Sequence, residues 1–238
     1  MSRVTAAAPI DAAKAIERIA LFESLDPEDR ARLLAASSVR RVPARKRLFR
    51  KGDPGRELFV LLRGRAKAAS ESKDRGTVFD FFEPGEVVGE IALLDGGPRT
   101  ATVTTVSTCD FLVLGRDELL ALLEREPRVA IRMLAACATR LRHTTELVED
   151  AVFLGLPARL AKRLLQLAQE YGTETGAGVR INLKLSQREL GELVGAARES
   201  VNRQLGHWED DGVLRVEGGY VTLVRPQVLT SLAALVVV

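Results

Sequence analysis

The sequence is poor in several residue types, and each scarcity narrows the class of protein. Among its 238 residues are two cysteines, Cys109 and Cys137, which are far apart and form no CxxC motif. Two thiols are too few for a disulfide framework or a four-thiolate iron–sulfur cluster, so we expect a protein of the reducing cytoplasm. No apolar run approaches the roughly 18 residues of a membrane span, and the N-terminal segment lacks the apolar stretch of a secretory signal. We therefore expect no membrane association.

Residues that form catalytic or metal sites are also scarce. The two histidines, His143 and His207, supply no matched catalytic constellation. The sequence contains no metal-ligand spacing, no nucleophile elbow and no glycine-rich loop for a nucleoside triphosphate. We therefore expect no enzyme activity, no catalytic residue, and neither a metal nor a redox cofactor. The net charge of +3 permits nucleic-acid binding but does not argue for it.

The first half of the chain is rich in short β-like runs. A helix is expected to begin at Asp26-Pro27 and to run toward Leu34. From Val39 to Leu114, β-rich runs alternate with glycine- and proline-rich turns, which predicts a small antiparallel barrel or sandwich. The expected strands are Leu58–Leu62, Val78–Phe82, Val87–Val88, Ala101–Val106 and Phe111–Leu114.

A helical pattern returns at Asp117 and is strongest after Pro127. Apolar and small residues recur there in alternating steps of three and four: Ile131, Leu134, Ala138, Leu141, Thr145, Val148 and Val152. This heptad spacing predicts a dimer seam, and the other interpretation is a helix lying on its own domain. The segment Phe153–Pro157 breaks the pattern and is expected to be a hinge. A further helix, from Pro157 to about Tyr171, is followed by an expected loop, Gly172–Gly178. The closing LAALVVV is interpreted as a final strand or a packed tail.

The C-terminal segment carries the pattern of a winged helix-turn-helix. Ser186 to Glu189 form a capping box at the start of a helix that ends at Gly195. The next helix, from Arg198 to about Asp211, places Val201, Leu205 and Trp208 on one face and polar residues on the other. Two strands, Val213–Val216 and Tyr220–Val224, flank the turn Gly218-Gly219.

The polar face of that second helix carries side chains that can hydrogen-bond to the edges of DNA bases. Its residues are Arg198, Glu199, Asn202 and Arg203. Arginine pairs with guanine O6 and N7, and glutamate accepts from cytosine N4. A solvated charged face on an ordinary helical hairpin is the other interpretation. The capped preceding helix and the wing favour a DNA reader.

The stretch VGEIALLDGGPRTATV, residues 88–103, is the most informative in the chain. Gly89 lets the backbone approach a ligand, and Glu90 can accept a hydrogen bond from a ribose hydroxyl. Arg99 can donate two hydrogen bonds to a phosphate. The stretch closely resembles the phosphate-binding cassette of cyclic-nucleotide-binding domains, in which Ile91 and Thr100 lie beside these residues.

The resemblance extends over nearly the whole chain, to the cAMP receptor protein/FNR superfamily of transcription regulators. It implies that Thr144 contacts the nucleobase in its own subunit and that Thr145 reaches the base bound across the dimer. It also implies that Arg198, Glu199 and Arg203 read bases, while Ser186, Gln187 and Ser200 are candidates for phosphate contact. The sequence departs from the family at Ala197, where a serine is common. The cluster ligands of the FNR branch are absent, and the placement of the two histidines does not support haem sensing.

We therefore expect an α+β protein with three parts: a cyclic-nucleotide-binding β-roll with flanking helices (1–126), a dimerisation helix (127–153) and a winged helix-turn-helix (154–238). It would be a cytoplasmic, allosteric homodimer that binds inverted-repeat duplex DNA and RNA polymerase. Its expected ligand is cAMP. Thr100 keeps cGMP open, because a threonine there accompanies guanine recognition in cGMP-dependent kinases. The alternative is a cyclic-nucleotide-binding signalling module that regulates a partner protein.

Overall fold

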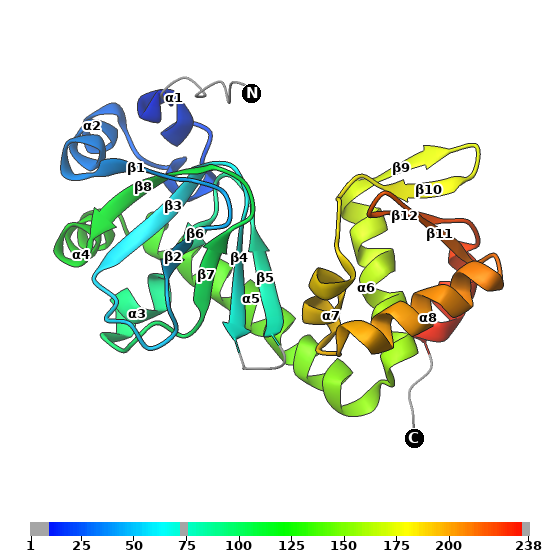
Figure 1. Cartoon of the computed structure of the whole chain (residues 1–238). Helices are drawn as coiled ribbons and strands as arrows, with labels where there is room; N and C mark the ends of the chain where they lie inside the picture. Colours follow the sequence, from blue (N-terminus) through cyan, green and yellow to red (C-terminus); the bar gives the residue numbers. More distant parts are fainter. Residues whose placement is uncertain (1–9, 72–75, 235–238) are drawn as a thin grey trace, which may run out of the picture. The chain divides into compact units, whose positions relative to one another are not determined.

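The computed structural model describes residues 10–71 and 76–234, which group into two compact units (Figure 1). The first unit consists of the described residues up to Ala69 together with Asp80–Arg140. The second consists of the described residues of Ser70–Phe79 together with those from Leu141 onward.

Two four-stranded sheets form the β-roll of the N-terminal half. The first sheet has the order β1-β8-β3-β6, and its strands are β1 (Ser38–Val42), β8 (Cys109–Gly115), β3 (Glu57–Arg63) and β6 (Val87–Val88). The second has the order β2-β7-β4-β5, and its strands are β2 (Arg47–Phe49), β7 (Thr102–Thr105), β4 (Ala66–Glu71) and β5 (Gly76–Phe82). Neighbours such as β3 and β8 pair antiparallel, as the sequence predicted.

Strand β3 is buried on both faces, which explains its unbroken apolar run. Phe59 and Leu61 face a core shared with Phe111, Val103 and other residues of the two sheets. Leu58 and Val60 face the opposite way, toward a second core under the helices. Those helices are α1 (Ala12–Ile16), the short 3₁₀ helix η1 (Ala20–Phe22), α2 (Pro27–Ala36), α4 (Arg116–Arg125) and the first turns of α5 (Pro127–Phe153).

Most elements of this half agree with the sequence prediction. Helix α2 begins after Asp26, whose side chain accepts from the Asp29 amide, and Pro27 is its first residue. All five expected strands are present within a few residues. Strands β1, β2 and β4 were not predicted, because SVRRV, RLF and AKAASE are charged or alanine-rich rather than apolar. The short helices α1 and α3 (Glu90–Asp95) were missed as well.

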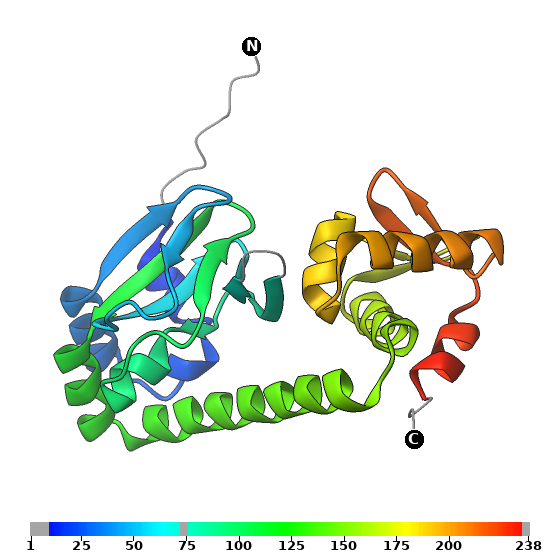
Figure 2. The same cartoon turned by 60° about the horizontal axis from the view of Figure 1, so that its bottom comes forward.

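Helix α5 is one uninterrupted helix of 27 residues, seen along its length in Figure 2. Val129 and Met133 are buried in the core of the first unit. The seven residues of the predicted heptad seam are all exposed. The five large apolar ones among them, Ile131, Leu134, Leu141, Val148 and Val152, are 58–69% exposed. A helix that lay on its own domain along this seam would have buried them.

The C-terminal half is a winged helix-turn-helix. Helix α6 (Leu156–Tyr171) buries Leu160, Leu164 and Leu167. A sheet of order β11-β12-β10-β9 follows, with β9 (Gly172–Thr175), β10 (Gly178–Ile181), β11 (Leu214–Glu217) and β12 (Tyr220–Leu223). Helices α7 (Gln187–Val194) and α8 (Arg198–Asp210) lie between β10 and β11 in the chain.

One sequence expectation in this half was wrong. The segment Gly172–Gly178, expected as a loop, forms β9, its turn and the start of β10, and Gly178 takes a φ of 123° that favours glycine. Of the closing segment, expected as a final strand or a packed tail, the described residues lie at the end of α9 (Pro226–Ala233), a helix that packs on α6, and form no strand. Residues 235–238 lie outside the described part. Among the described helices, none is long and apolar enough to cross a membrane.

Candidate nucleotide pocket and DNA-reading surface

The cassette begins where β6 ends at a left-handed glycine. Gly89 has a φ of 85° and caps α3, a conformation that glycine adopts without strain. A Cβ atom at this position would collide with Nη1 of Arg99. Gly89 therefore allows both the sharp turn and the close approach of the guanidinium.

Arg99 is buried, with only 4% of its surface exposed. Its Nη1 donates to the carbonyl oxygen of Gly89 at 2.7 Å, and its Nη2 donates to that of Glu57 at 2.6 Å. The guanidinium also lies 4.2 Å from the centre of the Phe49 ring. Burial lowers the pKa of Arg99, against the opposing effect of the Glu57 and Glu90 carboxylates. Its Nε atom is buried without a hydrogen-bond partner among the described residues.

Glu90 is buried as well and forms an ion pair with Arg140 of α5. Arg140 also donates to the carbonyl oxygen of Val87 at 3.2 Å and lies over the ring of Phe82. Burial alone would lower the pKa of Arg140, but the carboxylates of Glu90 and Asp80 outweigh it and raise the pKa. Arg140 therefore remains a cation beside Glu90.

The cassette holds two orphaned polar atoms of opposite character. One is Nε of Arg99, and the other is Oε2 of Glu90, which is buried with no hydrogen-bond partner in the described part of the chain. Buried polar atoms are normally paired, so such atoms point to a missing ligand or water. A ligand with an anionic oxygen for Arg99 and a hydroxyl for Glu90 would satisfy both.

The other predicted ligand contacts lie outside this buried group. Ile91 and Thr100 are exposed at either end of the cassette. Thr144 and Thr145 are exposed residues of α5 in the second compact unit, and the Thr145 hydroxyl donates to the Leu141 carbonyl oxygen at 3.0 Å. Arg140 was not predicted as a contact. Its cationic character four residues before Thr144 was the available signal, since residues four apart share a helix face.

In the winged helix-turn-helix, the predicted capping box is present at the start of α7. The Ser186 amide donates to the Glu189 carboxylate at 2.8 Å, and the Glu189 amide donates to the Ser186 hydroxyl at 3.2 Å. Gly195 ends the helix in the left-handed region, with a φ of 63°. Gln187 donates its side-chain amide to Asn202 at 2.6 Å, which joins α7 to α8.

Helix α8 separates its faces as the sequence predicted. Val201, Leu205 and Trp208 are buried beneath it. The exposed residues include Arg198, Glu199, Asn202 and Arg203, while Ser200 is half-buried. Ala197 occupies the cap position and makes no side-chain capping bond, in keeping with the loss of the serine that is common there.

Comparisons with known proteins assign both halves of the chain. Residues 39–126 match the model of the cyclic nucleotide-binding domain, and residues 158–232 match that of the Crp-like helix-turn-helix domain. The CRP-like cAMP-activated global transcriptional regulator of Mycobacterium tuberculosis is 32% identical over 87% of this chain and 93% of its own length. The chain belongs to the cAMP receptor protein/FNR superfamily of transcription regulators.

Further relatives agree on the family and differ in the ligand that they name. The cyclic AMP receptor protein of Thermus thermophilus is 30% identical over 90% of this chain and 96% of its own. A solved structure of CLP from Xanthomonas campestris, described as a c-di-GMP responsive global regulator, is 31% identical with a TM-score of 0.73, and covers 83% of this chain and 99% of its own. Members of the superfamily are transcription regulators, not enzymes, which confirms the expectation for this chain.

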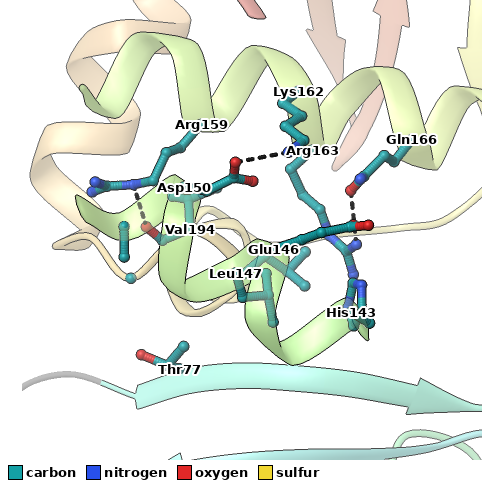
Figure 3. A pocket seen from close by; sticks show the side chains of 13 residues that line it. Thr77, His143, Glu146, Leu147, Asp150, Arg159, Lys162, Arg163, Gln166 and Val194 are labelled. Carbon is teal, nitrogen blue, oxygen red and sulfur yellow. Dashed lines mark hydrogen bonds and ion pairs between the residues drawn. The ribbon is translucent and has the colours of Figure 1, made fainter. Parts of the chain in front are cut away.

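A polar cluster at the junction of α5 and α6 was missed by the sequence analysis (Figure 3). Arg159 donates Nε to the carbonyl oxygen of Val194 at 3.1 Å and Nη1 to that of Leu154 at 2.9 Å. Lys162 pairs with Asp150 at 2.7 Å. Arg159 thereby caps the carboxyl ends of α5 and α7 together, where carbonyl groups carry partial negative charge. The predicted hinge Phe153–Pro157 is thus held to the first helix of the DNA-reading pair.

Proposed function

We propose that this chain is a homodimeric regulator in which cAMP, bound in the cassette of Gly89, Glu90 and Arg99, controls sequence-specific DNA binding by α8. The observation that carries this proposal is the pair of orphaned atoms, Arg99 Nε and Glu90 Oε2, in one buried cassette. A cyclic nucleotide offers an anionic phosphate oxygen and a ribose hydroxyl, which match those two atoms.

The choice of cAMP rests on two supports. Two relatives that this chain resembles over most of its length are named for cAMP. By the family resemblance, Thr144 and Thr145 match the positions that contact adenine, and Ile91 and Thr100 are further candidate contacts within the cassette. Thr100 makes cGMP the second candidate. The name of the Xanthomonas relative makes c-di-GMP a third ligand to test.

The occupant proposed for the exposed seam of α5 is a second copy of the chain. A row of mostly apolar residues at alternating spacings of three and four matches the a and d positions of a two-helix coiled coil. Arg142, Glu146 and Glu149 are exposed between these positions and would keep the rest of the helix solvated. The three parts 1–126, 127–153 and 154–238 are then ligand, dimer and DNA domains.

The proposed DNA site is an inverted repeat that mirrors the two-fold axis of the dimer. Arg198, Glu199 and Arg203 would contact bases, and Ser186, Gln187 and Ser200 would contact phosphates. RNA polymerase is proposed as the partner through which bound dimer acts on transcription.

Calorimetry and DNA binding on one preparation test the proposal. Purified wild type is titrated with cAMP, cGMP and c-di-GMP, its oligomeric state is measured by analytical ultracentrifugation, and operator sequences are selected from random duplex with and without ligand. We expect a dimer that binds cAMP most tightly and selects an inverted repeat only with ligand. Tightest binding of either other nucleotide would overturn the ligand assignment alone. Ligand binding without any selected DNA would instead favour a signalling module that acts on a partner protein.

A further inference from the structure

Two aromatic rings adjoin the buried cation of the cassette. The guanidinium carbon of Arg99 lies 4.2 Å from the centre of the Phe49 ring and 5.6 Å from that of the Phe59 ring. The face of an aromatic ring carries partial negative charge and attracts a cation within about 6 Å. Of the two rings, Phe49 therefore makes the closer and stronger contact with the cation.

Strand β2 directs the Phe49 ring toward the inside of the β-roll. Phe49 is the last residue of β2 and pairs with Val103 of β7. The register of this pairing shifts between Arg47 and Phe49. A shift of this kind interrupts the regular alternation of side chains and changes their direction. As a result, the consecutive residues Leu48 and Phe49 both pack against the core between the two sheets.

The aromatic core holds the Phe49 ring in place. The centres of the Phe49 and Phe59 rings are 5.8 Å apart, and the ring of Phe59 meets that of Phe111 edge-on at 5.9 Å. Phe59 and Phe111 are both buried. Offset and edge-on contacts between rings are favourable. Phe49 is thus anchored to a rigid core at the point where it contacts Arg99.

The chain that follows β2 also fixes the backbone of Arg99. The Arg99 amide donates to the carbonyl oxygen of Asp53 at 2.9 Å, and the Gly52 amide donates to the carbonyl oxygen of Arg99 at 2.8 Å. The backbone and both Nη atoms of Arg99 are therefore held by carbonyl and amide groups. Hydrogen bonds from a guanidinium lie in its plane, whereas an aromatic ring attracts the cation from its face. The ring thus supplies a contact that the carbonyl groups do not.

We propose that Phe49 is a positioning residue for the phosphate of the cyclic nucleotide. Its ring holds the guanidinium of Arg99 in the orientation in which the buried Nε atom is presented to an anionic phosphate oxygen. The inference rests on the proposed function, because it assigns a role within the proposed ligand site. A ring that only filled space in the core would affect charged and uncharged ligands alike.

The test compares cAMP with its uncharged methyl phosphotriester, which keeps the base, the ribose and the cyclic ester but lacks the anionic oxygen. Affinity for cAMP is measured by calorimetry on the full-length chain, and affinity for the ester by competition with cAMP. The variants are Phe49→Leu, Phe49→Tyr and the control Phe111→Leu, which removes a ring that contacts Phe59 in the same core. Thermal melting establishes that each protein is folded.

We expect Phe49→Leu to weaken cAMP binding by about tenfold and binding of the uncharged ester by no more than about twofold. Phe49→Tyr keeps the ring face and should bind cAMP within about threefold of wild type. Phe111→Leu should lower the melting temperature, because it leaves a cavity in the core. Any loss of affinity that it causes should be the same for the two ligands.

A second measurement keeps the shape of the ring and changes its charge. Phenylalanines with three and five fluorine atoms, incorporated at position 49, withdraw negative charge from the ring face in two steps. We expect cAMP affinity to fall at each step, while affinity for the uncharged ester stays constant. This series also serves if Phe49→Leu does not fold.

Equal losses for cAMP and the ester in Phe49→Leu would overturn the inference, because the ring would then only fill space. Unchanged cAMP affinity across the fluorinated series would overturn it as well. Failure of wild type to bind any cyclic nucleotide would refute the proposed function itself, which is a separate outcome.

Discussion

Arg140 on α5 forms an ion pair with Glu90, which lies fifty residues earlier in the chain and inside the cassette. Glu90 thus presents one carboxylate oxygen to Arg140, while the other, Oε2, has no hydrogen-bond partner among the described residues. The cation offsets the cost of burying the carboxylate and fixes the direction of its free oxygen. A ribose hydroxyl would meet an acceptor already held in place.

We predict that Arg140→Gln weakens cAMP binding by about tenfold, the effect of losing one hydrogen bond to a charged group. The buried carboxylate would lose its counter-ion, and its orientation would no longer be fixed. Isothermal titration of the dimer measures the change. The control is Arg132→Gln, which removes the same charge from the same helix at a residue paired with Glu23. Equal affinities in Arg140→Gln and wild type would show that Arg140 does not prepare Glu90 for the ligand.

We predict that Arg99→Ala nearly abolishes cAMP binding and that Glu90→Ala weakens it less. A guanidinium contact to phosphate is charge-assisted, whereas the ribose hydroxyl is neutral. Because Arg99 also bonds two carbonyl oxygens, Arg99→Lys is included to retain charge without the forked geometry. Calorimetric titrations with cAMP measure the affinity of all three variants, and analytical ultracentrifugation measures whether each has the oligomeric state of wild type. Wild-type affinity in Arg99→Ala and Glu90→Ala would remove the cassette from the ligand site.

Thr145 and Thr144 should have separable effects. Thr145 lies in the heptad seam, where its hydroxyl donates back to Leu141, so it would couple ligand to the paired helices. Thr145→Ala should therefore reduce the cAMP stimulation of DNA binding by more than it reduces cAMP affinity, and Thr144→Ala should mainly reduce affinity. Both quantities are measured on the same preparation. A parallel fall of affinity and stimulation in Thr145→Ala, or no change in either, would rule out the cross-dimer role.

The buried Asp110 predicts how stability depends on pH. Burial alone would raise its pKa, but Arg41, at 2.7 Å, and Arg63 outweigh that effect, so the pKa of Asp110 lies below its usual value. The carboxylate therefore contributes its full stabilisation above about pH 4, the unfolded-state value, and loses it as the pH falls through the lower folded-state pKa. Asp110→Asn should cost about 2 kcal/mol of unfolding free energy at pH 7.

Thermal and denaturant unfolding from pH 7 to pH 3 measure that cost. The difference between wild type and Asp110→Asn should shrink at the acid end, since wild type then loses the same charge. Asp95→Asn, at an exposed residue of α3, is the control for a changed carboxylate without a buried ion pair. A difference that stays constant across this range would mean that the ion pairs of Asp110 do not stabilise the fold.

The elements that the sequence predicted well are those in which the spacing of apolar residues matches the buried face of the strand or helix. Leu58–Leu62 is apolar because β3 is buried on both faces, and the spacing of Val201, Leu205 and Trp208 reports the buried side of α8. Strand β1 could not be predicted this way. Its residues SVRRV are exposed or nearly so, and it is a strand because its backbone pairs with β8. Pairing of this kind depends on β8, which lies about seventy residues later in the chain. The residues of β1 alone therefore do not reveal the strand.

The candidate site likewise contains residues that the sequence predicted and residues that it did not. Gly89, Glu90 and Arg99 were predicted because the cassette that the sequence resembles carries those residue types at that spacing, and the structure brings the three together. Arg140 and Arg159 were missed because their roles depend on tertiary contacts, with Glu90 in one case and with the carbonyl groups of Leu154 and Val194 in the other. An arginine on a helix looks the same in sequence whether it is solvated or buried against a carboxylate.

Base reading by α8 gives the last prediction. Glu199 is exposed in the first turn of the helix, beside Arg198, and would accept from a cytosine amine. Glu199→Ala should relax the preference at one base pair in each half-site of a TGTGA-like inverted repeat. The lost base contact is worth roughly 1–3 kcal/mol of discrimination against the wrong base. The control is Lys184→Ala, at an exposed residue before the capped helix, which should at most weaken binding evenly across sequences. Selection from randomised duplex with saturating cAMP reports both effects, because a lost base contact changes the motif whereas a lost phosphate contact changes only the yield. The same selected motif for Glu199→Ala and wild type would mean that α8 does not read that base pair through Glu199.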